Sequence, residues 1–287
     1  MSTVNGDNGA LLKRLDELQA KVEKLDAESE VRKLHHKYGY YLDKCLYKEA
    51  LALFADHPDT YVQFMNGRFK TKAGVKRLYI DRFSASFVKG RNGPVHGFLL
   101  DHLQAQDIVD YYPGTGNDPA KAKGRFRALM SAGTHESMGA ENLPRGLRQW
   151  WEGGLYENEY IKEDGVWKIF RLRYYPFWYD PTVPCLSEKL ANIVLWHRRH
   201  GVYDKGWQYT PPDFVPPFTR TIGDGDPLGP DEFVENDERL WPDTRVVPFH
   251  YAHPVTGEQV DEADLRAPTL GTDPKDAKPA RVIGDTF

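Results

Sequence analysis

Three residues in this sequence have side chains suited to proton transfer. Asp43 lies near the end of a predicted helix, and His96 and His102 lie in the segment VHGFLLDHLQ. A carboxylate and an imidazole that lie close together can share a proton near neutral pH, which makes a usable acid/base pair. By helical periodicity alone, Asp43 lies about 100° from the apolar stripe of its helix. The spacing therefore leaves open an exposed acid at a helix end.

Arginines add groups that could hold a developing anion. Arg125 and Arg127 share one face of a predicted strand, and an inward arginine would bind a phenolate. Arg171 and Arg173 have the same parity as Ile169, so one of them closes the pocket mouth if Ile169 points into the core. An outer face in water, or a surface salt bridge, is an equal alternative for each pair.

Signals for other kinds of site are weak. His35 with His36, and His197 with His200, suggest metal ligands, but no Cys or carboxylate completes either set at a zinc-like spacing. The glycine-rich runs GRNGP and GDGDPLGP occur in turns, without the strand-to-helix setting of a phosphate loop. We therefore expect neither a metal nor an organic cofactor.

Composition bounds the remaining choices. The chain has 287 residues, 40% hydrophobic and 28% charged, with a formal net charge of -4 whose signs are interspersed. Without a basic patch, nucleic acid is not an expected partner. The chain contains no run of about 18 apolar residues, and its start lacks the apolar core of a signal peptide. We therefore expect no membrane association and a cytoplasmic location, with Cys45 and Cys185 reduced.

Two helices are predicted at the start of the chain. Leucines and valine recur at alternating spacings of four and three between Leu11 and Leu25, which indicates a short amphipathic helix. This helix packs either on a neighbouring subunit or on its own domain. The apolar series continues through residues 31–45 as a second helix that faces a core.

Strands follow the helices. Alternating runs lie at VHGFLLDHLQAQDIVDYY and GRFRALMSAG, and a further pair is joined by Asp164 and Gly165, the strongest short hairpin signal. Helices followed by strands predict an α+β fold with a curved antiparallel sheet. We expect an amphipathic helix over 1–30, the α+β domain over 31–180, and a Pro/Gly-rich arm over 181–287 that wraps the core or a partner. Free disorder is the alternative for the arm.

Three segments resemble the SnoaL-like family of the nuclear transport factor 2-like superfamily. They are LHHKYGYYLDKCLYKEALALFAD, VHGFLLDHLQ and EDGVWKIFRLR, which match the first helix pair, the His-bearing central strand and the closing hairpin. The resemblance covers about half of the chain, from Val31 to Trp178. It implies a cone-shaped fold, and its dehydratase and lyase members work without a cofactor. The superfamily also contains binding and transport members, so the fold alone does not establish catalysis.

The resemblance implies roles for individual residues. A tyrosine and an acid lie close together on the first long helix of the dehydratase branch, which Tyr38 and Asp43 reproduce, and His96 matches the strand histidine. VHGFLLDHLQ is one residue longer than the usual pattern, which suggests a bulge. Catalysis is thus expected from Asp43, His96 and Tyr38. The expected substrate-binding residues are Tyr41, His102, Arg127, Tyr156, Arg171 and Trp178.

The implied function is a lyase acting on a phenolic aromatic alcohol. One version, similar to a diarylpropane lyase of this family, forms a quinone methide and releases formaldehyde and a stilbene. Alternatives are a dehydratase that releases only water, a ketosteroid-isomerase-like isomerase or polyketide cyclase, and a non-catalytic binding module. Relatives of this shape commonly form homodimers or homotrimers, which we also expect here.

Overall fold

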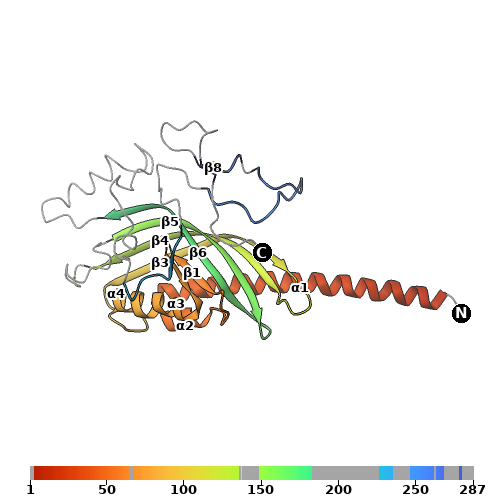
Figure 1. The fold of residues 1–287 in the computed structure, drawn as a ribbon, viewed down its shortest axis with the longest axis horizontal. Helices are drawn as coiled ribbons and strands as arrows, with labels where there is room; N and C mark the ends of the chain where they lie inside the picture. Colours follow the sequence, from red (N-terminus) through yellow and green to blue (C-terminus); the bar gives the residue numbers. More distant parts are fainter. Residues whose placement is uncertain are drawn as a thin grey trace.

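The computed structural model describes residues 3–64, 67–135, 137, 149–182, 226–234, 246–261, 263–267 and 278–279. The helices are α1 (Thr3–Asp43), α2 (Tyr47–Ala52), α3 (Thr71–Lys76), the π-helix η1 (Arg77–Ser84) and α4 (Ala85–Val88). The strands are β1 (Tyr61–Phe64), β2 (Gly67–Lys70), β3 (Phe98–Tyr112), β4 (Lys121–Thr134), β5 (Gln149–Glu163), β6 (Val166–Thr182), β7 (Glu232–Phe233), β8 (Arg266–Ala267) and β9 (Lys278–Pro279). The helices gather on one face of a curved, open sheet, which confirms the predicted α+β class (Figure 1).

The main sheet has the strand order β3-β4-β5-β6-β1-β2-β7, and β8 and β9 form a separate pair. Long antiparallel ladders join β3 to β4, β4 to β5 and β5 to β6. β1 instead runs parallel to β6, with Tyr61 opposite Arg171. The sheet is therefore mixed rather than purely antiparallel. Local patterns do not show this pairing, because it joins segments far apart in the sequence.

The predicted hairpin connects β5 to β6. Glu163 pairs with Val166, and the two residues between them, Asp164 and Gly165, have φ angles of 51° and 78°. Positive φ at both central residues is the geometry of a type I′ turn, which Asp-Gly favours. This turn fixes the register of β5 and β6 at one end.

The two predicted N-terminal helices form one continuous helix, α1. Its first part projects from the body in Figure 1 and is exposed over residues 8–26. From Ala27 onward the same helix packs on the sheet and buries Val31, Leu34, Tyr38 and Leu42 in the main core. Nothing in the sequence between residues 26 and 31 breaks a helix. The prediction of two separate helices was therefore wrong.

Two described parts of the C-terminal arm contact the main sheet. Strand β7 pairs with β2 at the edge of the sheet. Val247 packs with Leu155 and Tyr175 on the sheet face opposite the helices, which we call the outer face. Cys185, His197 and His200 lie outside the described residues. No helix in the described part of the chain is long and apolar enough to cross a membrane.

Candidate active site

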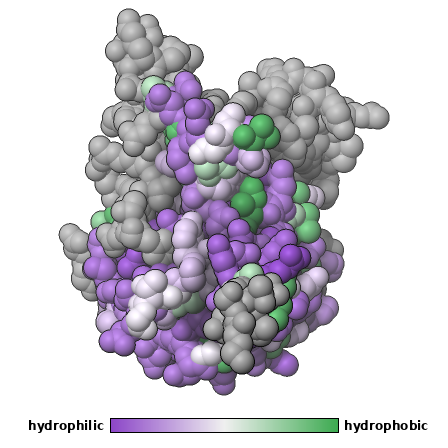
Figure 2. All heavy atoms as spheres, turned by 90° about the vertical axis from the view of Figure 1, so that its right-hand side faces the viewer, coloured by the Kyte–Doolittle hydropathy of each residue, from purple (hydrophilic) through white to green (hydrophobic). Residues whose placement is uncertain are grey.

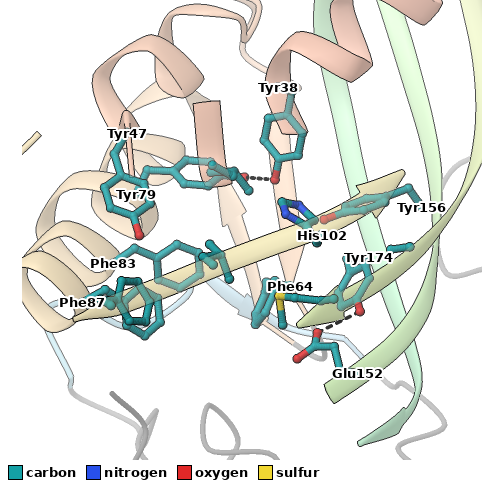
Figure 3. A pocket seen from close by; sticks show the side chains of 15 residues that line it. Tyr38, Tyr47, Phe64, Tyr79, Phe83, Phe87, His102, Glu152, Tyr156 and Tyr174 are labelled. Carbon is teal, nitrogen blue, oxygen red and sulfur yellow. Dashed lines mark hydrogen bonds between the residues drawn. The ribbon is translucent and has the colours of Figure 1, made fainter. Parts of the chain in front are cut away.

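A cavity of about 50 Å³ lies between the helices and the sheet. Figure 3 shows aromatic rings from α1, α2, η1 and α4 meeting side chains from the strands. Three alternate residues of β3 face it, and alternate residues of β4 and β5 do the same. The lining residues are Tyr38, Leu42, Tyr47, Phe64, Tyr79, Phe83, Phe87, Phe98, Leu100, His102, Ala128, Met130, Glu152, Tyr156 and Tyr174. An apolar, aromatic wall with few polar groups is typical of a small-molecule site.

The central polar pair of this site is Asp43 with His102. Asp43 is the last residue of α1, and His102 stands on β3 under it. His102 bonds the same Asp43 carboxylate oxygen through its ring Nδ1 and through its backbone N–H, the latter at 3.2 Å. The Asp43 side chain is 10% exposed and the His102 side chain 4%. The pair is a buried carboxylate and imidazole whose His102 lines the aromatic cavity, an arrangement suited to acid/base catalysis.

Gln104 occupies the other nitrogen of His102. Its amide Nε2 lies 2.9 Å from His102 Nε2, while its Oε1 is buried and has no hydrogen-bond partner in the described structure. The side chain fits because Gly39 on α1 has no Cβ, and an added Cβ would lie 2.8 Å from the amide nitrogen. With the amide N–H donating to Nε2, the ring proton stays on Nδ1 toward Asp43.

A second, polar pocket of about 220 Å³ adjoins the pair. It is lined by His36, Gly39, Tyr40, Asp43, Asp101, His102, Leu103 and Gln104. Asp43 and His102 thus lie between this pocket and the aromatic cavity, because His102 lines both. A proton taken from a molecule in the aromatic cavity can therefore reach water on the polar side.

Three tyrosines, Tyr38, Tyr79 and Tyr156, line one part of the cavity. Tyr38 and Tyr79 share a hydrogen bond of 2.8 Å, drawn in Figure 3, and the Tyr156 ring lies 6.2 Å from the Tyr38 ring. Burial raises the pKa of Tyr38 and of Tyr156 well above the ordinary value of a tyrosine. Burial likewise raises the pKa of Tyr79. These hydroxyls therefore stay protonated, so they can donate hydrogen bonds but are not suited to act as bases.

A second carboxyl group lies across the cavity from the tyrosines. Glu152 on β5 is 2% exposed and accepts a hydrogen bond of 2.8 Å from the Tyr174 hydroxyl (Figure 3). Tyr174 stacks on Phe64 and lies 4.8 Å from the Tyr156 ring. Glu152 was not predicted, because the strand expected from the sequence began at Leu155, whereas β5 begins at Gln149. Its even spacing from Tyr156 puts both residues on one face of β5.

The family model of the SnoaL-like domain matches residues 23–173. The chain belongs to the SnoaL-like family. A search of the curated proteins found no match.

Solved structures similar to this SnoaL-like chain share little sequence with it. A hexachlorocyclohexane dehydrochlorinase, LinA-type3 from Novosphingobium barchaimii, is 17% identical, with 56% of this chain and 93% of that chain covered and a TM-score of 0.41. A putative scytalone dehydratase from Novosphingobium aromaticivorans is 17% identical, with 54% and 87% covered and a TM-score of 0.38. At these TM-scores we draw nothing about the site from either protein.

His96 lies away from the cavity of this SnoaL-like domain, against expectation. It is exposed in the turn before β3, where its Nε2 lies 3.2 Å from Ser137 Oγ. The expected bulge between His96 and His102 is absent. β3 begins only at Phe98, and its register shift lies between Ala105 and Ile108. Alternation is therefore unbroken from Phe98 to His102, so His102 takes the inward position.

The arginines expected in the cavity lie on the outer face. Strict alternation on β4 puts Phe126 in the core and leaves Arg127 exposed, bonded to Gln106. On β6 an extra residue, Phe170, breaks the alternation: Tyr160 pairs with Ile169, but Glu159 pairs with Arg171. The parity argument from Ile169 to Arg171 was therefore wrong, because a bulge lies between them.

Arg171 instead bonds Glu159 at 3.2 Å, and Arg173 bonds the same carboxylate at 2.6 Å. Arg125 donates to Glu157 at 2.6 Å and to the carbonyl oxygen of Val247 at 3.0 Å. The outer face thus carries buried ion pairs that are covered in part by the C-terminal arm.

Two further residues that were predicted to contact the substrate do not line the aromatic cavity. Tyr41 is half-buried and packs against the main core from α1. Trp178 covers Gly153 of β5, where an added Cβ would lie 2.4 Å from the indole ring. Neither residue is among those that face the aromatic cavity.

Of the histidines considered as metal ligands, His35 lies in the core. His35 is fully buried, stacks on Phe126 at 3.7 Å, and bonds the Tyr160 hydroxyl at 3.0 Å through Nδ1. Burial, with smaller contributions from His36 and His102, lowers the pKa of His35 well below its usual value. His35 is therefore a neutral core residue. In the described part of the chain, no three His, Cys, Asp or Glu side chains gather as a metal site.

Proposed function

We propose that this protein is a cofactor-independent lyase that eliminates a leaving group from a phenolic aromatic alcohol. The main support is the Asp43–His102 pair, which lies at the wall of a cavity lined by aromatic rings. Membership of the SnoaL-like family supports an enzyme that converts a small molecule. The aromatic lining suits a flat substrate.

The proposed proton-transfer group is His102. Asp43 engages Nδ1, so Nε2 is the nitrogen that exchanges a proton with the substrate once the Gln104 amide gives way. The carboxylate orients the imidazole and stabilises the imidazolium that forms during turnover. Tyr38 and Tyr156 then donate hydrogen bonds to the phenolate oxygen, which their protonated state allows.

In the leading version the substrate is a diarylpropane diol, such as one derived from lignin. Protonated His102 gives its proton to the benzylic hydroxyl, the C–O bond breaks, and water leaves. The phenol gives up its proton to water and supplies the electron pair, which yields a quinone methide.

Neutral His102 then removes the proton from the primary hydroxyl. The C–C bond to the hydroxymethyl carbon breaks, and its electron pair forms the stilbene double bond. The quinone methide ring becomes a phenolate again. Formaldehyde leaves, and the phenolate takes a proton back from water. The diol thus becomes a stilbene, formaldehyde and water, and His102 ends in the protonation state in which it began.

The free volume of the cavity limits the bound substrate. An engineered cavity that holds one benzene measures about 150 Å³, against about 50 Å³ here. A substrate with two rings therefore requires ring side chains such as Phe83 and Phe87 to move. This small volume favours, as a second candidate, a dehydratase that acts on a smaller alcohol and releases only water.

The test is product analysis with the purified full-length chain. A phenolic diarylpropane diol is incubated with the protein, and stilbene absorbance and formaldehyde are measured together. We expect both products in equal amounts, and none from the same diol with its phenol methylated, because a quinone methide needs the free phenol. Loss of water without formaldehyde would favour the dehydratase. Equal rates on the phenol and its methyl ether would reject the quinone methide.

A further inference from the structure

The projecting part of α1 carries an apolar stripe that nothing in the described structure covers. Leu11, Leu15, Leu18, Val22 and Leu25 are each between 54% and 67% exposed. Every residue from 8 to 26 of the helix is exposed. At about 1.5 Å per residue, this stretch extends roughly 28 Å beyond the body. A helix of this length is marginal alone in water, so its stability depends on a packing partner.

The spacing of the residues in the apolar stripe indicates that the packing partner is another helix in a coiled coil. Intervals of four, three, four and three residues place leucine at the d positions of a heptad, and Leu15 and Val22 at the a positions. The stripe ends where Ser29 and Arg32 would be the next a and d residues, which is also where α1 begins to pack on its own sheet. The apolar stripe, which would form the seam of a coiled coil, is thus confined to the part of α1 that projects from the body.

The flanking charges favour an identical, parallel partner. In a parallel pair, Lys21 at position g lies opposite Asp26 at position e of the second helix, and Arg14 lies opposite Gln19. In an antiparallel pair Arg14 and Lys21 would face each other, which like charges disfavour. Figure 2, viewed from the side toward which α1 projects, shows a mostly hydrophilic surface with only small hydrophobic patches.

We propose that residues 11–25 of α1 form a two-stranded parallel coiled coil with the same helix of a second copy of this chain. The chain is then a homodimer joined away from the aromatic cavity. The coiled coil is independent of the reaction proposed above.

The test is the mass of the full-length protein in solution. Sedimentation of wild type at micromolar concentration is expected to give twice the 32.9 kDa of one chain. Leu18→Asp, in the centre of the seam, is expected to give the single-chain mass. The matched control is Ala20→Asp, which adds the same charge to an exposed position off the seam and leaves the dimer intact. Circular dichroism checks that both variants fold.

The parallel orientation of the two helices is tested by oxidising the Leu11→Cys variant. Wild type is oxidised beside it, to show any crosslink that the native cysteines form. A parallel register brings the two new thiols together, so a covalent dimer is expected. A wild-type monomer, a trimer, a dimer that survives Leu18→Asp, or a dimer that Leu11→Cys does not crosslink would each overturn the proposal.

Discussion

Replacing Gly39 by alanine should disturb His102 without unfolding the protein. The new Cβ would lie 2.8 Å from Nε2, 2.9 Å from Cδ and 3.0 Å from Oε1 of Gln104. Ordinary carbon contacts begin at about 3.5 Å, so the amide must retreat by roughly 0.5 to 1 Å. Its 2.9 Å contact with His102 Nε2 then exceeds hydrogen-bonding distance.

The effects of Gly39→Ala on stability largely cancel. Alanine in a helix interior gains up to about 1 kcal/mol over glycine, and one lost hydrogen bond costs about 0.5–1.5 kcal/mol. The free energy of unfolding should therefore stay within about 1 kcal/mol of wild type. Without the Gln104 amide, the proton of the resting His102 ring is no longer fixed on Nδ1 toward Asp43. The loss of this tautomer and ring orientation should lower kcat/KM by on the order of tenfold to a hundredfold.

The measurements are urea unfolding, kcat/KM for the elimination, and the ¹⁵N signals of the His102 ring. Gly9→Ala is the matched control, because it makes the same change in the same helix at a position with no atom within 4 Å. It should leave activity and ring signals unchanged. Wild-type activity and unchanged His102 signals in Gly39→Ala would refute the role given to Gln104.

Two further predictions concern stability. The pKa of His35 is lowered in the folded state, so at low pH the unfolded chain takes up a proton that the folded chain does not. The stabilisation from neutral His35 is therefore fully present above about pH 6.5. Below that pH the free energy of unfolding falls by up to about 1.4 kcal/mol per pH unit. In urea unfolding at several pH values, His35→Phe should flatten this slope and exposed His253→Gln should keep it; equal slopes would contradict the assignment. Arg125→Met should cost about 3–5 kcal/mol, because it leaves buried Glu157 without its guanidinium partner. Arg127→Met, exposed on the same face, should cost less than about 0.5 kcal/mol, and similar losses from both would contradict this account.

Much of the fold was predictable because local signals agree with it. The apolar stripe over residues 31–45 faces the core, and the Asp164–Gly165 turn sets a hairpin. The parallel β1–β6 pairing and the continuity of α1 were not predicted. Strand pairing between distant segments depends on tertiary packing, which no short pattern records.

The candidate site was predictable only where alternation stays regular. Tyr38, Asp43 and Tyr156 lie where the family resemblance put them. The choice of His96 over His102 depended on a bulge whose place the sequence does not fix. The prediction that Arg171 points inward failed because β6 carries one extra residue, Phe170, that the sequence pattern does not reveal. A single inserted residue reverses every later side chain, so parity fails beyond each bulge.

The central claim is that the Asp43–His102 pair transfers the proton, and kcat/KM of three variants tests it most directly. His102→Gln and Asp43→Asn should each lose about a hundredfold to ten-thousandfold of the elimination rate. His96→Gln, which changes an exposed histidine outside the cavity, should stay within about twofold of wild type. Loss of activity in His96→Gln with full activity in His102→Gln would contradict the account.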